Sequence, residues 1–267
     1  MKLYWKICII AALIVFGAVT HYLLLTRNSP QDVGKIPLAT STISAPGIVD
    51  SSGKGYEIKT LPLPQKKEVR APDVATLSTG IVPKNDFEKL VLSNLEAARA
   101  ALLKVPDSYY DWLAAGIALG QLERYEAARD VFVYTAVTWP TEPVSHGNLG
   151  SLYHLYLKDF PKSEAAYERA IAYNPEQPGW YRGLFELYRY SYKQKTDAWE
   201  QTLQQGIEAT QAIDLMALLA SRYAELGRLP ESVAAYDAAI AEAEKKENSA
   251  VVDALIAERA SVRARIK

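Results

Sequence analysis

The side chains best suited to chemistry in this 267-residue chain lie between Arg182 and Tyr190. Arg182, Glu186 and Arg189 follow one another at steps of four and three residues, which places them on one face of a helix. A guanidinium group can hold a carboxylate through two parallel hydrogen bonds, so this face could bind an acidic ligand. Alternatively, Glu186 pairs with both arginines on a solvated helix face. The spacing leaves both interpretations open.

Histidines are the other candidates for chemistry, and the chain has three, His21, His146 and His154. His146 and His154 are eight residues apart, whereas metal-binding histidine pairs on a helix use the closer His-x-x-x-His spacing. The sequence also lacks a glycine-rich phosphate loop and a nucleophile elbow. We therefore expect a protein that is not an enzyme and that holds no metal or cofactor.

The elements that must position these side chains follow from a repeat of 34 to 35 residues. A large side chain recurs at steps of 34, 35 and 35 residues, as Trp112, His146, Tyr181 and Met216. His146 is therefore interpreted as a packing residue. Pro140 and Pro175 close the first two units. A unit of this size cannot bury its apolar face alone, so neighbouring units must stack.

A helix–turn–helix unit of this length and composition resembles the tetratricopeptide repeat (TPR). The resemblance covers about residues 107–243. The first unit carries the pattern in Trp112, Gly116, Tyr125, Ala128, Phe132 and Pro140. The third unit departs from it, because Phe185 stands where the family usually has a small residue, and Gly206 where it usually has alanine. The resemblance implies an all-α, TPR-like solenoid of helical hairpins and says little about function.

The same resemblance implies where a ligand binds, because the first helix of each TPR unit lines the concave face. The side chains on that face that packing does not use are Asn148, Ser151, His154, Arg182, Glu186, Arg189, Tyr190, Ser221 and Glu225. Relatives that bind peptide C-termini hold the carboxylate with Asn, Lys and Arg at such positions. Asn148, Arg182 and Arg189 look like part of that clamp, which predicts a peptide or helix of a protein partner in the groove.

A tyrosine cluster lies at the end of the same predicted helix. Tyr188 occupies a packing position, whereas Tyr190 and Tyr192 point elsewhere. Exposed tyrosines anchor many protein interfaces, and they can equally stack on a sugar. A third interpretation is that these rings fill a gap that Phe185 opens in the third unit.

The N-terminal stretch predicts a membrane anchor over residues 1–27. Residues 7–25 form an uncharged span of 19 residues. As a helix this span is about 28 Å long, close to the thickness of a bilayer core. A cleaved signal peptide is the alternative, but the apolar run continues past its one candidate cleavage site, Ala18–Thr20. Two lysines before the span outweigh one arginine after it. The N-terminus is thus predicted to be cytoplasmic and the repeats extracytoplasmic, as in a bacterial envelope.

The remaining chain divides by composition and periodicity. Residues 28–85 hold seven of the 14 prolines, which predicts a flexible, disordered linker. The segments that follow are a leading helix over 86–106, about four TPR-like units over 107–246 and a capping helix over 247–267. The single cysteine, Cys8, excludes an intramolecular disulfide.

Charge excludes one class of partner. The formal net charge is −1, so we expect no nucleic-acid binding. The sequence as a whole predicts a membrane-anchored adaptor or scaffold that binds a protein partner. The alternative is a self-assembling homo-oligomer that forms part of an envelope or secretion complex.

Overall fold

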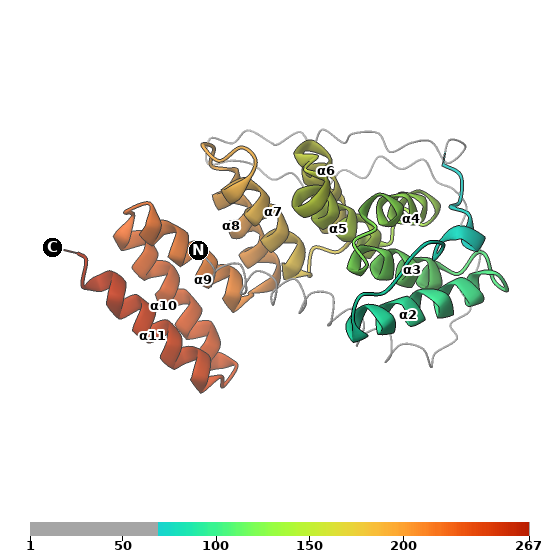
Figure 1. Ribbon diagram of the computed structural model, residues 1–267. Coiled ribbons are helices and arrows are strands. Elements are labelled where there is room, and N and C mark those ends of the chain that lie inside the picture. Colours follow the sequence, from blue (N-terminus) through green and yellow to red (C-terminus); the bar gives the residue numbers. More distant parts are fainter. Residues whose placement is uncertain (1–68, 267) are drawn as a thin grey trace.

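The computed structural model describes residues 69–266 as a curved row of antiparallel helices (Figure 1). Within these residues there are ten α-helices and no strand, which confirms the predicted all-helical, TPR-like solenoid. The α-helices are α2 (Asp86–Leu102), α3 (Tyr109–Gln121), α4 (Tyr125–Thr138), α5 (Pro143–Leu152), α6 (Phe160–Tyr173), α7 (Pro178–Tyr190), α8 (Ala198–Thr210), α9 (Ile213–Glu225), α10 (Leu229–Lys245) and α11 (Ser249–Arg263).

The predicted anchor over residues 1–27 lies outside the described residues, as does the predicted linker up to residue 68. Among residues 69–266, no helix combines the length and the apolarity that a bilayer crossing requires.

The end of the linker differs from the prediction. A short 3-10 helix, η1 (Val74–Thr76), precedes α2. Val74, Leu77 and Ile81 are partly buried against the N-terminal hydrophobic core, which α2 to α5 mainly form. η1 contacts α2, so this segment adds its apolar side chains to the core at the N-terminal end of the solenoid. The packed domain therefore begins before residue 85.

The leading helix α2 begins as its capping pair predicts. The Asn85 side chain accepts a hydrogen bond from the Glu88 backbone N–H at 2.8 Å, and the Asn85 amide donates to the Glu88 carboxylate at 3.1 Å. This reciprocal arrangement satisfies N–H groups that a helix start otherwise leaves unpaired. The helix ends at Leu102, short of Pro106, because a proline disfavours helical geometry in the residue before it.

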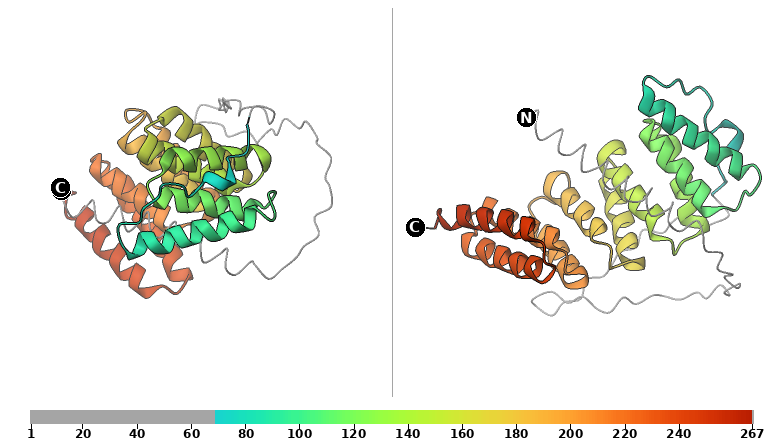
Figure 2. Two further views of the ribbon diagram at one scale, coloured as in Figure 1. Left: turned by 45° about the vertical axis from the view of Figure 1, so that its right-hand side comes forward. Right: turned by 90° about the horizontal axis from the view of Figure 1, so that it is seen from below.

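Four hairpins follow α2, and each pairs two consecutive helices: α3 with α4, α5 with α6, α7 with α8, and α9 with α10. α11 packs on α10 and closes that end (Figure 2). The turn inside each hairpin contains one residue with a left-handed backbone: Glu123, Lys158, Lys193 and Gly227, with φ between 54° and 76°. Only the fourth turn uses glycine, the residue that adopts this geometry without steric cost.

The second unit contains one residue more than the first before its turn, and the structure shows how the residue is accommodated. Residues Tyr153–Leu157 form a π-helical turn, η2, directly after α5. An inserted residue commonly widens a helix in this way. The wider turn keeps α5 and α6 antiparallel despite the insertion.

The interior of the hairpins combines a small residue on the first helix with an aromatic ring on the second. A Cβ atom added to Gly116 would lie 2.5 Å from the Phe132 ring, and one added to Gly150 would lie 2.7 Å from the Tyr167 ring. In the third unit the sizes are reversed: buried Phe185 lies on α7 and the smaller Leu203 lies on α8. The third unit is nevertheless a packed helical hairpin.

Polar clusters join successive hairpins in the C-terminal half. The Tyr188 hydroxyl and the Lys193 ammonium both donate to Glu164, which lies on α6 of the preceding unit. One unit later, the Tyr223 hydroxyl donates to Glu200 at 2.6 Å and Arg228 donates to the same carboxylate at 2.7 Å. The α4–α5 junction has no such cluster in the described structure. There the matching position on α4 is Arg129, which pairs with Asp130 on its own helix.

Candidate functional site

The first helices of the second, third and fourth hairpins form one continuous surface. α5 contacts α7 and α7 contacts α9 directly, although the second helix of a unit lies between them in sequence. This arrangement places the predicted groove residues of three units side by side. We therefore describe the concave face, defined as the exposed surface of α5, α7 and α9, as the candidate site.

Unpaired polar atoms gather where α5 meets α7. The Asn148 side-chain nitrogen, the Trp180 indole nitrogen and the His146 Nδ1 are all buried without a hydrogen-bond partner in the described residues. The Trp180 ring lies directly on Gly147, between the other two, because an added Cβ there would be 2.1 Å from the ring. Buried donors without acceptors each cost about 1–3 kcal/mol, so this junction carries two N–H groups whose hydrogen-bonding capacity the described residues do not use.

Ser151 is held by a contact within its own unit. Its hydroxyl lies 2.9 Å from the Tyr167 hydroxyl of α6. The Tyr167 ring is buried between Gly150 and Gly183, and the hydroxyl end of the ring lies against Gly183 on α7. Ser151 therefore stabilises the junction between the second and third units in the free protein.

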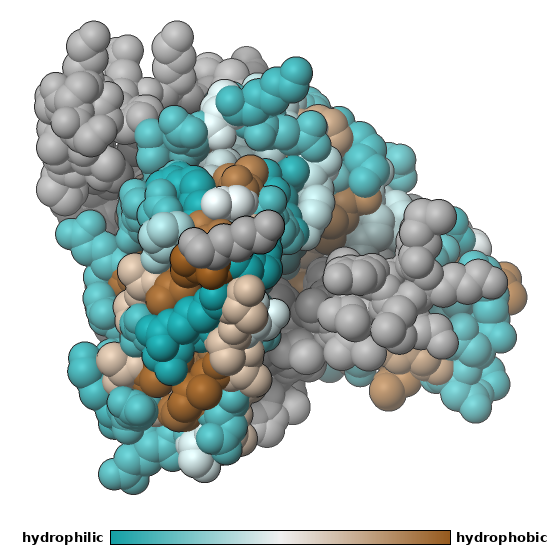
Figure 3. All heavy atoms as spheres, turned by 90° about the vertical axis from the view of Figure 1, so that its left-hand side faces the viewer, coloured by the Kyte–Doolittle hydropathy of each residue, from teal (hydrophilic) through white to brown (hydrophobic). Residues whose placement is uncertain are grey.

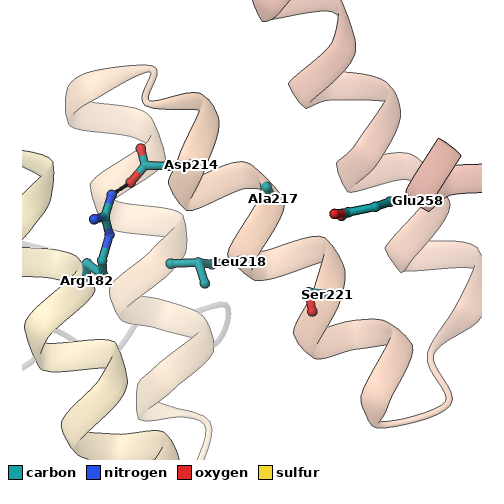
Figure 4. Close-up of a pocket in the computed structure, with 6 residues that line it drawn as sticks. All are labelled: Arg182, Asp214, Ala217, Leu218, Ser221 and Glu258. Carbon is teal, nitrogen blue, oxygen red and sulfur yellow. Dashed lines mark ion pairs between the residues drawn. The ribbon is translucent and has the colours of Figure 1, made fainter. Parts of the chain in front are cut away.

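Arg182 is paired, but its partner differs from the one that spacing suggested. The guanidinium forms an ion pair with Asp214 at the start of α9 (Figure 4). Among the described residues, Glu186 forms no ion pair with it. The pair borders a pocket of about 480 Å³ that is also lined by Ala217, Leu218 and Ser221 of α9 and by Glu258 of α11. The pocket thus has an aliphatic wall between an ion pair at one edge and a carboxylate at the other.

Arg189 is likewise paired across the groove. It forms an ion pair with Glu225 at the end of α9, and Glu225 also accepts from Arg222 at 3.0 Å. The Arg189 guanidinium lies 4.7 Å from the centre of the Tyr190 ring, a cation–π distance. Tyr190 is 59% exposed and is the largest exposed aromatic surface on α7. The two predicted groove residues Arg189 and Glu225 are thus brought together as a pair.

Glu186 lies between the two arginines of α7 and is half-buried. Burial raises the pKa of its carboxyl, and the charges of Arg182 and Arg189 oppose that shift. The two arginines of α7 thus face carboxylates of α9, and the opposite charges neutralise one another. A ligand carboxylate would have to displace Asp214 or Glu225 to reach an arginine, so this face is not prepared for a free carboxylate.

The two histidines of the repeats serve packing. His146 is 1% exposed, stacks on Tyr173 and has its Nε2 2.9 Å from the Pro140 carbonyl oxygen. His154 is buried under the loop after α7, with Nε2 3.0 Å from the Ser191 hydroxyl, rather than open to the groove. Burial, and then the charge of Lys158, lower the pKa of His154 to about 4. Across residues 69–266, no group of three or more metal-ligand side chains is close enough to hold an ion.

Sequence reasoning missed two residues of this site. Asp214 lies 32 residues after Arg182, and its acidic charge at the start of α9 was a usable signal. Trp180 follows Pro178 in the first turn of α7, and the signal for its position was the glycine at 147, which leaves space for a large ring on α5. Both residues contact a residue of the neighbouring unit, whereas the repeat pattern identifies equivalent positions within each unit.

Similar proteins are found among solved structures, at low sequence identity. No protein-family model and no curated protein matches the chain. A TPR protein of Thermus thermophilus is similar in structure, with a TM-score of 0.46, 18% identity, and coverage of 64% of this chain and 89% of that one. The MamA protein has a TM-score of 0.49 and 20% identity, with 65% and 94% covered. YrrB, described as a TPR protein with an unusual peptide-binding site, has a TM-score of 0.45 and 14% identity, with 64% and 94% covered.

Proposed function

We propose that this protein is a membrane-anchored adaptor that holds an extended segment of a protein partner on its concave face. The proposal is of a binding protein rather than an enzyme. A TPR-like solenoid offers a rigid curved surface for an extended or helical segment of another chain. In this proposal the contacts come from Asn148, Ser151, Arg182, Glu186, Arg189 and Tyr190, together with Trp180 and Asp214.

The observation that carries the proposal is the Asn148 amide. Its nitrogen is shielded from water and has no acceptor within the described residues. An amide presents a donor and an acceptor together, so it matches the C=O and N–H of an extended peptide backbone. Asn148 as a whole is half-buried, so a turn of its side chain toward the groove would bring the amide to a partner backbone carbonyl. That carbonyl would satisfy the donor that the free protein leaves unpaired, which favours binding.

The pairing of the arginines indicates which segment fits. Because Arg182 and Arg189 already have carboxylate partners on α9, the groove favours an internal segment of near-neutral charge over an acidic C-terminus. The pocket beside Leu218 is suited to one aliphatic or aromatic side chain of that segment. Tyr190 then supplies an aromatic anchor at the rim.

Anchoring completes the proposal. Residues 7–25 would cross the membrane, with the N-terminus in the cytoplasm and the repeats outside it, in a bacterial envelope. Residues 28–68 would then separate the solenoid from the bilayer, since a chain of this composition reaches tens of ångströms. This part rests on the sequence alone.

A photo-crosslinking experiment tests the adaptor function. We would place a photoreactive phenylalanine at Tyr190 in the full-length protein, irradiate native membranes and identify the adducts by mass spectrometry. We expect a discrete adduct with a different protein, and we expect Asn148→Ala to abolish it. Gln201→Ala, an exposed amide on α8, is the matched control and should leave the adduct unchanged. An adduct that survives Asn148→Ala at full yield would contradict the role of Asn148.

A stability measurement separates binding from folding. Since the Asn148 amide nitrogen has no partner in the free protein, Asn148→Ala should leave the free energy of unfolding unchanged or raise it by up to about 1 kcal/mol. Loss of binding together with a large loss of stability would show instead that Asn148 is a structural residue.

Exchange of charge tests whether Arg182 contacts the partner. Arg182→Asp breaks the ion pair with Asp214, and the double variant Arg182→Asp with Asp214→Arg restores it in the opposite order. If Arg182 contacts the partner, the double variant should recover stability but not the Tyr190 adduct. Full recovery of both would limit Arg182 to a structural role.

A further inference from the structure

The pocket between α7, α9 and α11 is lined by three charged side chains, and one of them has no partner of opposite charge. Arg182 and Asp214 form an ion pair with each other at one edge (Figure 4). Glu258 lines the other edge, and it forms no ion pair within residues 69–266. The side chains of the pocket therefore leave one negative charge without a counter-charge.

The basic side chains of α9 and α11 are already used elsewhere. Neither helix contains a lysine, and each arginine in or just after them has another acceptor. The contacts are Arg222 with Glu225, Arg259 and Arg263 with Asp237, and Arg265 with the Ala224 carbonyl oxygen. Glu258 therefore remains available to a cation that a ligand brings.

A hydrogen bond orients the Glu258 carboxylate toward the pocket. The Tyr236 hydroxyl of α10 donates to the Glu258 Oε2 at 2.8 Å. Burial, and then this hydrogen bond, raise the pKa of Tyr236, so the hydroxyl stays protonated and donates at neutral pH. The carboxylate points from α11 toward α9, where Ala217 and Ser221 lie one turn apart (Figure 4). Its Oε1 accepts no hydrogen bond from the described residues and is free to accept one from a ligand.

The wall between the two edges changes from apolar to polar along α9. Ala217 and Leu218 supply the apolar part, and Ser221 adds a hydroxyl that forms no hydrogen bond within the described residues. A hydroxyl oxygen can accept hydrogen bonds as well as donate one. A side chain laid along this wall therefore contacts apolar surface first and then two acceptors, the Ser221 hydroxyl and the Glu258 carboxylate.

The surface at this end of the solenoid is mixed in the same way. Seen from the end where α10 and α11 lie, apolar patches are crossed by hydrophilic side chains (Figure 3). A wholly aliphatic or aromatic side chain in the pocket would leave the Glu258 charge without a partner. A long apolar stem with a cationic tip matches both the apolar wall and the carboxylate.

We propose that the pocket binds a lysine side chain of the partner segment, with its stem on Ala217 and Leu218 and its ammonium group between Ser221 and Glu258. Lysine carries a point charge with three donors at the end of a flexible four-carbon stem. Arginine fits less well, because its planar fork matches two free carboxylate oxygens and Tyr236 already binds one oxygen of Glu258.

This inference rests on the proposed groove function and specifies one side chain of the segment that the groove holds. A single lysine is compatible with a segment of near-neutral net charge. Glu258 is exposed, so its pair with the lysine adds little affinity, but it discriminates against an acidic residue at that position. The helix predicted to cap the solenoid, α11, thereby also takes part in recognition.

Selection from a peptide library provides the first test. We would select a phage-displayed library of random dodecapeptides on the full-length chain in mild detergent and sequence the bound pool. Wild type should enrich lysine several-fold over the input library, and arginine less. Glu258→Gln keeps an oxygen for the Tyr236 hydroxyl but removes the charge, so the lysine enrichment should disappear while apolar preferences remain. Glu258→Lys should enrich aspartate or glutamate instead.

The control and the two possible failures are distinct. Glu244→Lys changes an exposed glutamate on α10 that does not line the pocket, so it should retain the lysine enrichment. A selection that enriches no peptide at all would contradict the groove function and, with it, this inference. Enriched peptides without lysine, or a lysine enrichment that Glu258→Gln retains, would overturn the assignment of this pocket alone.

A double-mutant cycle provides the second test, because it detects direct contact. We would label one enriched peptide with fluorescein and measure its Kd by anisotropy, beside a version with norleucine in place of lysine. Norleucine keeps the stem and lacks the ammonium group, so it should weaken binding to wild type by about two- to fivefold, the range of an exposed ion pair. On Glu258→Gln the same replacement should have no effect, and on wild type its effect should shrink as NaCl is raised. An equal loss on both proteins would show that the ammonium group contacts another side chain and would overturn the proposal.

Discussion

The second and third hairpins of this solenoid have the same fold and opposite interiors. In the second hairpin, Gly150 on the first helix receives the Tyr167 ring of the second helix. In the third, Phe185 fills the position of that glycine, and Leu203 replaces the aromatic residue. Trp199, which stands in register with Ser163, meets the Phe185 ring edge-on at 6.4 Å. The large ring thus moves from the second helix to the first, and Trp199 adds a second ring where the second hairpin has a serine.

The comparison shows what a helical repeat constrains. Cores accept coordinated changes of size at facing positions when the apolar pattern is kept. The third hairpin departs from the family pattern at Phe185, and its partner helix compensates. A position-by-position match to the family therefore underestimates how well this unit folds.

Removal of the Phe185 ring should have the largest effect. Phe185 is 1% exposed, so Phe185→Ala leaves a cavity in the core. The free energy of unfolding should therefore fall by about 3–5 kcal/mol. Equilibrium urea unfolding gives the value, and hydrogen exchange in α7 and α8 localises it. Adding Leu203→Tyr should recover part of the loss by restoring the order of sizes found in the second hairpin. A double variant less stable than Phe185→Ala would disprove the compensation.

The dependence of stability on pH should be the next largest difference between the second and third hairpins. His154 lies in the second hairpin, at the position that Arg189 occupies in the third, and a histidine can change its charge between pH 4 and 7. Its folded-state pKa of about 4 lies below the ordinary value of 6.5. Its contribution to stability is therefore complete above pH 6.5 and is lost as the pH falls toward 4. The loss is on the order of 3 kcal/mol, since one pKa unit corresponds to about 1.4 kcal/mol.

The variant His154→Gln checks this prediction. Its stability should change less than that of wild type between pH 6.5 and 4, measured by urea unfolding at each pH. Glu168 acts in the opposite sense, because burial, and then the charge of Glu164, raise its pKa to about 7. Subtracting the free energy of unfolding of the wild type from that of the variant at each pH removes the contribution of Glu168. Parallel pH profiles would refute the assignment to His154.

Overpacking the second hairpin should have an intermediate effect. Gly150→Ala places a Cβ 2.7 Å from the buried Tyr167 ring, so we expect a loss of about 1–3 kcal/mol. Gly120→Ala is the control, because its Cβ would meet only the Ala128 Cβ, at 4.0 Å. That substitution should be neutral or stabilise the helix by up to about 1 kcal/mol. Thermal unfolding compares the two variants, and equal losses would show that ring contact is not the cause.

The turns should show the smallest difference. Lys158→Gly relieves a left-handed backbone at φ 57° and should stabilise the second hairpin by about 0.5 kcal/mol. Lys193→Gly relieves the same strain in the third hairpin but removes the 2.5 Å contact with Glu164, so it should bring no net gain. Thermal unfolding of both variants tests the contrast. Equal gains would show that the Lys193 contact contributes nothing to stability.

The sequence predicted what is local and periodic. The α2 capping pair and the hairpins followed from spacing, because these contacts join residues within one or two helices. The partner of Arg182 did not follow, because Asp214 belongs to the next unit and the rotation between units decides which carboxylate is in reach. The packing of Val74, Leu77 and Ile81 was hidden by a surrounding composition typical of linkers. The unpaired Asn148 donor could not be predicted, because a sequence does not show which buried groups lack a hydrogen-bond partner.

The polar clusters at the hairpin junctions give the two halves of the solenoid different sensitivities to dissolved salt. The α6–α7 and α8–α9 junctions use Glu164 and Glu200, each shared by a hydroxyl and a cation. These two junctions also share an apolar core, which includes Ala170 and Leu219, whereas the α4–α5 junction has an apolar core, with Ala136 and Leu149, and no such polar cluster among the described residues. Rising ionic strength screens charge pairs and strengthens apolar burial. High salt should therefore weaken the polar part of the α6–α7 and α8–α9 junctions, whereas the α4–α5 junction has no such shared carboxylate to lose.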